Sequence, residues 1–387
     1  MTTDATPSAA ASADEEETLR VSPLELFFDL VFVFTITQLT GSLAHHLDGG
    51  GLLRVVIMLA LIWWMYDAFI WLTNAMPPTT HARRALMLAG MTGFLIISLA
   101  IPHAFDGRGV VFGLAYLFVI AVHCGTFAAS GVPLSSVARM GGLNVLNATL
   151  VVIGGYLQGG TQLGLWTVSL ALLLATPRLV GLGEFTIRCG HFVERHGLIM
   201  IIAFGESVIA IGVGVGEAPL TAGRVSAAVL MLCVGLGLWW AYFGHGDDER
   251  GEHALALLPA AQRNFAAVRI YNLGHYGLLL GVLLFAAGVK SAVAHAGGHL
   301  DGAPAWALAG GIALFLTADA ADRHALGLRP VLPRLCAAGL LAATVPLGTG
   351  ISALTQIGAA VLVLALCFGY EEVTARAASV PAGTVHA

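Results

Sequence analysis

Apolar stretches of membrane-spanning length follow one another along almost the whole chain, separated by short runs rich in Gly, Pro and charged residues. A helix needs about 20 apolar residues to cross the hydrocarbon core of a membrane. Helices are expected there because the backbone groups find no water to bond with. The sequence therefore predicts an all-α fold, a polytopic transmembrane helical bundle with about 12 spans. We expect these spans at 23–45, 52–75, 84–103, 109–130, 139–158, 161–182, 196–216, 222–244, 264–289, 302–322, 331–348 and 351–370.

The composition excludes a soluble fold. Only 11% of the 387 residues are charged and 57% are hydrophobic, whereas soluble proteins carry about 25% charged residues. We expect the surroundings to be membrane lipids and expect no nucleic-acid partner. Whether the chain forms a homo-oligomer stays open.

The basic residues predict an orientation for the bundle. With the N-terminus inside, the cytoplasmic side holds Arg20, Arg83, Arg84, Arg139, Arg178, Arg188, Arg195, Arg250, Arg263, Arg269, Arg323, Arg329, Arg334 and Arg376, and the outer side holds Arg54, Arg108, Arg224 and Lys290. These 14 and 4 residues sum to all 18 Lys and Arg, and cytoplasmic loops are enriched in such residues. We therefore expect a cytoplasmic (inner) membrane protein with both termini in the cytoplasm.

Two segments resemble each other at a nearly constant offset. The segment from Phe27 to Phe34 aligns with Phe204 to Ile211 at an offset of 177, and 63–66 (WWMY) aligns with 239–242 (WWAY) at 176. The pattern predicts two parallel six-helix repeats, at 20–185 and 186–373, with a site near their interface. The flanking segments, 1–19 and 374–387, are expected to be a disordered acidic cytoplasmic tail and a short cytoplasmic tail.

Asp29 and Glu206 are the leading site candidates, because they occupy equivalent positions in the two repeats. An ionisable residue inside a membrane span is costly and defaults to a functional hypothesis. Glu25 shares the face of Asp29 but aligns with Ile202, so it ranks lower. One interpretation is proton or cation binding. The other is that each carboxylate pairs with an arginine or a buried amide and only fixes helix packing, and the sequence does not separate the two.

Further polar residues lie within the expected spans. Asp67 lies on one helical face with Trp63, while Tyr271 and His275, four residues apart, face the same way. His275 is either an ion-binding group or a hydrogen-bonded packing residue. The two tryptophan pairs, Trp63 with Trp64 and Trp239 with Trp240, also fit an aromatic belt at the membrane interface.

No motif in the sequence carries catalysis. A nucleotide-binding loop, a metalloprotease motif and a nucleophile elbow are all missing from the sequence. The cysteines have no metal-site spacing, and the histidines of the expected outer loops lie in Gly-rich segments. We expect no catalytic residues, no metal and no cofactor, and we regard an enzyme as the less favoured reading.

Three motifs resemble signatures of a known family. The segment 22–33 (SPLELFFDLVFV) resembles the opening signature of the bacterial low temperature requirement A family, with Phe28 and Asp29 at its centre. The segment 194–198 (ERHGL), which contains Glu194 and Arg195, followed by 204–207 (FGES), resembles that family's second signature. The segment 269–271 (RIY) with His275 is similar to a third. Phe204 departs from the aliphatic residue expected there.

The resemblance extends from Arg20 to Glu372 and implies a multi-pass bacterial inner-membrane protein tied to growth at low temperature, with no settled biochemical activity. The architecture is also similar to that of the endolysosomal potassium channel family, which carries an F-S-D motif in the first helix of each six-helix repeat. A fold analogy does not carry function.

The sequence thus favours permeation, by a channel or transporter, of a proton, cation or small solute through a site between the repeats. Two alternatives remain: a membrane-embedded enzyme that modifies or handles lipid, and a membrane sensor or scaffold that transports nothing.

Overall fold

The computed structural model describes residues 21–128, 134–180, 187–217 and 219–379. Within these ranges every regular element is a helix, which confirms the all-α prediction. The expected tail 1–19 lies outside the described residues. The C-terminal tail was expected to begin at 374, but the last helix continues to Ser379.

The first half of the chain forms helices with short connections. They are α2 (Pro23–His45), α3 (Gly49–Ala75), α4 (His81–Ala100), the 3-10 turn η1 (Ile101–His103), α5 (Gly109–Ala128), α6 (Leu134–Gly155) and α7 (Gly159–Val180). Polar caps mark where several helices begin. Ser22 and Glu25 form a reciprocal capping box at α2, and the side chains of Asp48 and Thr80 accept backbone N–H groups at the starts of α3 and α4.

The second half adds shorter elements to the same plan. Its helices are α8 (Cys189–Val215), α9 (Ala222–Phe243), α10 (Asp247–Ala256), α11 (Ala260–Ala267), the π-helix η2 (Val268–Gly274), α12 (His275–Ala294), α13 (Gly302–Ala325), α14 (Leu332–Ala342), α15 (Val345–Gly350) and α16 (Ala353–Ser379). Four features differ from the expected spans. Helix α8 begins at Cys189 rather than near 196, α10 occupies an expected loop, η2 interrupts the ninth span, and the expected span 331–348 is divided between α14 and α15.

In the described part of the chain, 11 helical segments are long and apolar enough to cross a membrane. The remaining expected span, 139–158, corresponds to α6, whose apolar described part, Gly141–Gly155, is shorter. The chain is thus a multi-pass helical membrane protein, and 11 of the 12 predicted spans have a counterpart of spanning length among the described residues. Neighbouring helices approach closely where they carry glycine. A Cβ on Gly311 of α13, for example, would lie 2.3 Å from the backbone nitrogen of Phe285 on α12.

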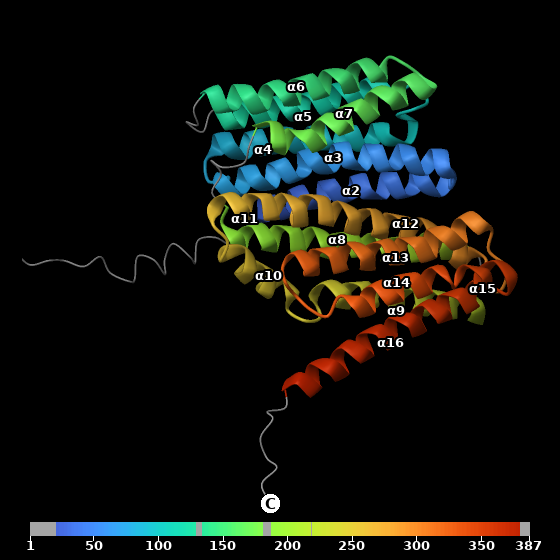
Figure 1. Cartoon of the computed structure of the whole chain (residues 1–387). Coiled ribbons are helices and arrows are strands. Elements are labelled where there is room, and N and C mark those ends of the chain that lie inside the picture. The colour runs from blue at the N-terminus through green and yellow to red at the C-terminus, as the bar shows by residue number, and fades with distance from the viewer. Residues whose placement is uncertain (1–20, 129–133, 181–186, 218, 380–387) are drawn as a thin grey trace, which may run out of the picture.

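The two halves of the chain lie side by side in the bundle (Figure 1). In the first half, α2 packs on α4, α4 on α5, α5 on α6 and α6 on α7. In the second half, α8 packs on α12, α12 on α13, α13 on α14 and α14 on α16. The halves meet where α2 and α3 contact α8 and α12. We call the end of the bundle where α2 begins the proximal end and the end where α2 finishes the distal end.

Candidate functional site

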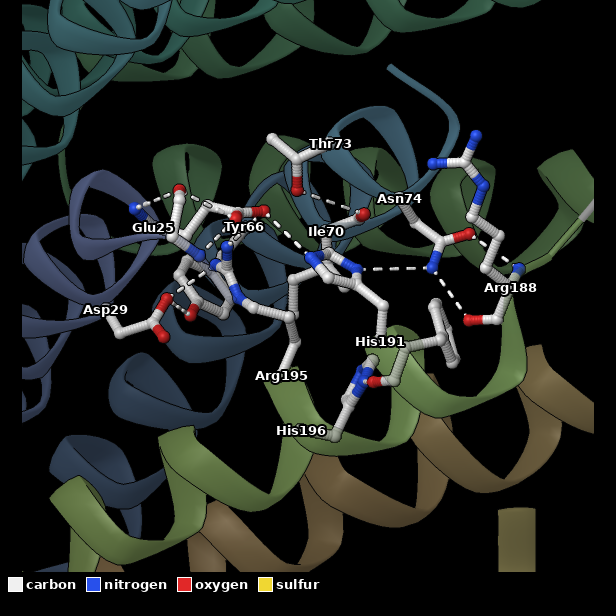
Figure 2. Close-up of polar contacts among 12 residues, drawn as sticks. Glu25, Asp29, Tyr66, Ile70, Thr73, Asn74, Arg188, His191, Arg195 and His196 are labelled. Carbon is white, nitrogen blue, oxygen red and sulfur yellow. Dashed lines mark hydrogen bonds and ion pairs between the residues drawn. The ribbon is translucent and has the colours of Figure 1, made fainter. Parts of the chain in front are cut away.

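A buried arginine on α8 joins the two halves near the proximal end (Figure 2). The Nη1 atom of Arg195 lies 3.0 Å from Oε1 of Glu25, and its Nη2 atom lies 2.5 Å from Oδ1 of Asp29. The Tyr66 hydroxyl on α3 also donates to Oδ1 of Asp29. Arg195, Glu25 and Asp29 are each at most 2% exposed. This arrangement is a buried ion-pair cluster of one cation and two anions that spans the interface of the halves.

His191 extends this cluster to α3. Its Nε2 atom lies 3.2 Å from Oε1 of Glu25, and its Nδ1 atom lies 3.3 Å from Nδ2 of Asn74. An amide nitrogen only donates, so Nδ1 accepts and the ring hydrogen sits on Nε2, the nitrogen that faces Glu25. Asn74 in turn bonds both the N–H and the carbonyl of Arg188, each at 2.9 Å. The start of α8 is therefore tied to α3 through a neutral histidine.

A second buried pair, Asp67 and His196, lies beside the arginine cluster. Nε2 of His196 is 3.1 Å from Oδ1 of Asp67, and the Asn272 amide on η2 donates to Oδ2 of Asp67 at 2.7 Å. Nδ1 of His196 faces the carbonyl of Phe192 at 2.8 Å. A carbonyl only accepts, so Nδ1 carries a hydrogen, and a further proton lies between Nε2 and the carboxylate. The pair therefore shares one proton.

Aromatic rings connect this pair to α12. The ring centroids of His196 and Tyr271 are 5.0 Å apart, and those of Tyr271 and His275 are 5.2 Å apart and stacked. His275 faces the carbonyl of Ile270 through Nδ1 at 3.2 Å and the Tyr242 hydroxyl on α9 through Nε2 at 2.8 Å. The π-helix η2 places Tyr271 and Asn272 in this cluster, and such π segments are frequent at functional sites.

The formal charges of these buried groups do not balance. Glu25, Asp29 and Asp67 contribute −3, while Arg195 and the proton shared with His196 contribute +2, which leaves −1. An uncompensated buried charge is costly. Oδ2 of Asp29 is also buried without a hydrogen-bond partner. The interface network therefore has the capacity to take up one more positive charge.

Glu206 lies apart from this network. Its Oε2 atom is 2.6 Å from the Thr37 hydroxyl on α2, whereas Asp29 bonds Arg195 and Tyr66. Arg195 and Glu206 are 11 residues apart on α8 (206 − 195), which is about 16 Å along a helix. The structure thus gives the two aligned acids separate partners at different depths.

The motif residues fall into different environments. Phe28 is buried against Tyr66, Phe69 and Phe94, while Glu194 is exposed. Trp63 is only 1% exposed and donates to the Asn272 carbonyl at 2.8 Å, and Trp64 is half-buried. Trp239 and Trp240 are 40% and 42% exposed. An aromatic belt is therefore compatible with the second pair but not with Trp63.

Several members of the network were not among the site residues predicted from the sequence, although the spacing places Asn74 on the helix face of Trp63 and Asp67. They are Tyr66, Asn74, His191, His196 and Tyr242. The two histidines were missed because the seventh span was expected to start near 196, which placed them at or before the helix end. Their spacing from Arg195 offered a signal, since residues three or four apart share a helix face.

A second buried arginine, Arg334 on α14, belongs to the second half alone. It bonds Glu371 on α16 at 3.0 and 3.1 Å, the Ala241 carbonyl at 2.9 Å, and Asp319 on α13. Among the residues that the structure describes, no group of three or more His, Cys, Asp or Glu is placed to hold a metal ion.

Residues 20–368 match the family model described as bacterial low temperature requirement A protein (LtrA). This chain belongs to the LtrA family. It is also 28% identical over 286 residues to an uncharacterized protein of Rhizobium meliloti (strain 1021), a match that covers 70% of this chain and 69% of that protein. No solved structure matches the chain. The interface network lies entirely within the part of the chain that matches the LtrA family.

Proposed function

We propose that this LtrA protein conducts protons across the membrane through the interface of its two halves. The observation that carries the proposal is the buried network of Glu25, Asp29, Asp67, Arg195 and His196, whose formal charge is −1. Ionisable side chains inside a membrane cost about 2.5–3.5 kcal/mol each on insertion scales and mark ion or proton pathways. The Arg334 cluster also combines one arginine with two carboxylates, so the feature particular to the interface network is its position between the halves together with the proton shared by Asp67 and His196.

The chemistry of the network favours a proton over a metal cation. The groups around Asp29 and Asp67 are hydrogen-bond donors, namely Arg195, Tyr66, His196 and Asn272. The Arg195 guanidinium, 2.5 Å from Asp29, repels a metal cation, whereas a proton needs only one unpaired carboxylate oxygen. Histidine also exchanges protons near neutral pH. The same site therefore suits proton transfer better than sodium or potassium binding.

The site location is consistent with two parallel six-helix repeats. The order of helix contacts is the same in the two halves, and a Thr-Gln pair lies near the start of both α7 (Thr161-Gln162) and α16 (Thr355-Gln356). Each glutamine donates to a backbone carbonyl outside its own helix. Gln162 donates to Ala104, between η1 and α5, at 2.7 Å, and Gln356 donates to Ala305, in the first turn of α13, at 2.9 Å. In parallel repeats the functional site is expected between the copies, which is where the network lies.

The proposal is tested by reconstituting the purified full-length protein in liposomes that contain a pH-sensitive dye. With an imposed membrane potential, the wild-type protein should acidify or alkalinise the lumen, and Asp29→Asn and Asp67→Asn should remove this flux. Asp319→Asn is the matched control, because Asp319 is a buried carboxylate paired with a buried arginine away from the interface. Wild-type vesicles as proton-tight as protein-free ones would refute the proposal.

A further inference from the structure

Glu206 is a fully buried carboxyl group without a counter-charge in contact. Its side chain is 0% exposed, and its Oε1 atom has no hydrogen-bond partner. The Thr37 hydroxyl is bonded to its other oxygen, at 2.6 Å. A buried carboxylate left in this state would be strongly disfavoured, and such groups normally neutralise instead.

The Thr37 hydroxyl is the hydrogen-bond partner of Glu206. The Thr37 oxygen lies 3.2 Å from the Val33 carbonyl and 2.6 Å from Oε2 of Glu206. A threonine hydroxyl has a single hydrogen. The Val33 carbonyl already accepts the backbone N–H of Thr37 within α2, so the hydroxyl can donate to Oε2 or, when Glu206 is protonated, accept from it. The Thr37 contact therefore fits a neutral carboxyl, and the burial of Oε1 without a partner favours that form over the carboxylate.

The charges around Glu206 do not replace the proton of a neutral carboxyl. Lys290 on α12 is the cation that acts on it electrostatically, but its backbone lies against Gly214, eight residues beyond Glu206 and about 12 Å along α8. Arg195, on the same helix as Glu206, is paired with Glu25 and Asp29.

The charged groups on the other neighbouring helices lie at other levels. On α2, Asp29 lies about 12 Å along the helix axis from Thr37. On α9, Arg224 lies at the start of the helix, and α3 carries Arg54 near its start and Asp67 in the proximal half.

A hollow lies at the distal end of the bundle. It has a volume of about 400 Å³ and is lined by Gln38, Ser42, His45 and Asp106, among others. Gln38 directly follows Thr37 on α2. The hollow therefore lies at the distal end of α2, beyond Thr37, and Gln38 is its lining residue nearest to Thr37 in the sequence.

We infer that Glu206 is a proton-binding site, held as a neutral carboxylic acid against Thr37 and serving the distal end of the interface. The site takes up a proton on Oε2 and releases it as the carboxylate forms, so no other reactant is needed. This inference deepens the proposed function and rests on it only for the direction in which the proton travels. The protonation state of Glu206 can be measured separately from proton transport.

Dicyclohexylcarbodiimide tests the protonation state in the full-length protein in lipid or detergent. The reagent adds to a carboxylic acid in apolar surroundings and leaves a stable N-acylurea, whereas a solvated carboxylate is not modified. Tandem mass spectrometry should find the adduct at Glu206 and not at Glu372, which is 44% exposed at its side chain. An infrared band of a protonated carboxyl should also be present in the wild-type protein and lost in Glu206→Gln.

Thr37→Val separates the two protonation states. If Glu206 already holds a proton, it should be modified both in the wild-type protein and in Thr37→Val. Modification of Thr37→Val alone would mean that Thr37 stabilises a carboxylate, and it would overturn the inference, as would the lack of the infrared band. Neither the labelling nor the infrared measurement depends on proton transport. Glu206 labelling in a protein that conducts no protons would refute the proposed function and leave this site standing.

Discussion

At the scale of single residues, two buried arginines supply the counter-charges for four buried acidic side chains. Arg195 pairs with Glu25 and Asp29 across the halves, and Arg334 pairs with Asp319 and Glu371 within the second half. Breaking a buried ion pair by removing one partner leaves an uncompensated charge, which is much more costly than losing an exposed pair. The stability of the bundle should therefore depend strongly on these guanidinium groups.

Replacing Arg195 with methionine should lower the free energy of unfolding by about 3–5 kcal/mol, because Glu25 and Asp29 lose their counter-charge. Thermal unfolding of the purified protein in detergent measures this. Arg376→Met should change stability by less than about 1 kcal/mol, because Arg376 is 78% exposed at its side chain. The triple variant Glu25→Gln, Asp29→Asn and Arg195→Met should recover part of the loss. Equal melting of the two single variants would contradict this prediction.

The sequence identified the acids of the network better than their partners. Asp29, Asp67 and His275 stand out because an ionisable residue in an apolar run is conspicuous. Their partners come from distant parts of the chain: 166 residues separate Asp29 from Arg195, and 205 separate Asp67 from Asn272. The side-chain pattern of one helix does not reveal which helix packs against it. The sequence therefore predicted candidates, while the three-dimensional packing selects which of them meet.

At the scale of elements, α12 and α13 form a close glycine-mediated contact. A Cβ on Gly311 would lie 2.3 Å from the nitrogen of Phe285, whereas nothing lies within 4 Å of a Cβ on Gly310. Gly311→Ala should therefore destabilise the protein by roughly 1–3 kcal/mol through overpacking. Gly310→Ala should be neutral or stabilising by up to about 1 kcal/mol, because alanine favours the helix. Thermal unfolding of both variants should give opposite signs, and equal effects would refute the close contact.

The π-helix η2 is the element that sets the register of the aromatic cluster. A π-helical segment holds one residue more than the α-helix that it interrupts. Deleting Leu273, which is 45% exposed, should therefore restore ordinary α-helical bonding. The residues before the deletion should then rotate by about 100° relative to His275. Asn272 and Tyr271 would then leave Asp67 and His196. We expect loss of proton flux in liposomes with a folded, monodisperse protein. A deletion variant with full flux would show that η2 is dispensable.

The sequence could not have predicted η2 or the division between α14 and α15. Hydropathy is the same for an α-helix, a π-helix and a broken helix, so the apolar run 264–289 gave a span and not its internal geometry. The expected loop after Gly244 contains α10, whose polar composition gave no membrane signal. Asn147 on α6 links two neighbouring helices, because it accepts from the Tyr116 hydroxyl on α5 and donates to the Ser169 carbonyl on α7.

At the scale of the whole molecule, the basic residues predict that the proximal end faces the cytoplasm. A membrane-impermeant maleimide checks this in intact cells, using single cysteines in a background with all 5 native cysteines replaced by serine. A cysteine at Asp106, exposed at the distal end, should be labelled from outside. One at Thr79, exposed at the proximal end, should be labelled only after permeabilisation. The reverse pattern would invert the orientation.

The family, the helical class and most of the spans were readable from the sequence because each depends on local composition and motifs. The arrangement of the halves was suggested by the aligned segments, yet the aligned acids Asp29 and Glu206 have different partners. The sequence alignment pairs the two acids, but in the structure they lie at different depths and contact different residues.

The pairing of Arg195 with α2 also constrains how the protein is made. Helix α2 leaves the ribosome with Glu25 and Asp29 long before the arginine that neutralises them, since 166 residues separate Asp29 from Arg195. At roughly 5–20 residues per second, the delay is on the order of ten to thirty seconds. During that time Asp29 lacks the counter-charge that Arg195 supplies in the folded protein, and an unpaired acid inside a span costs up to about 2.5–3.5 kcal/mol. We therefore expect a chain that ends before Arg195 to be less stable in the membrane than the complete chain.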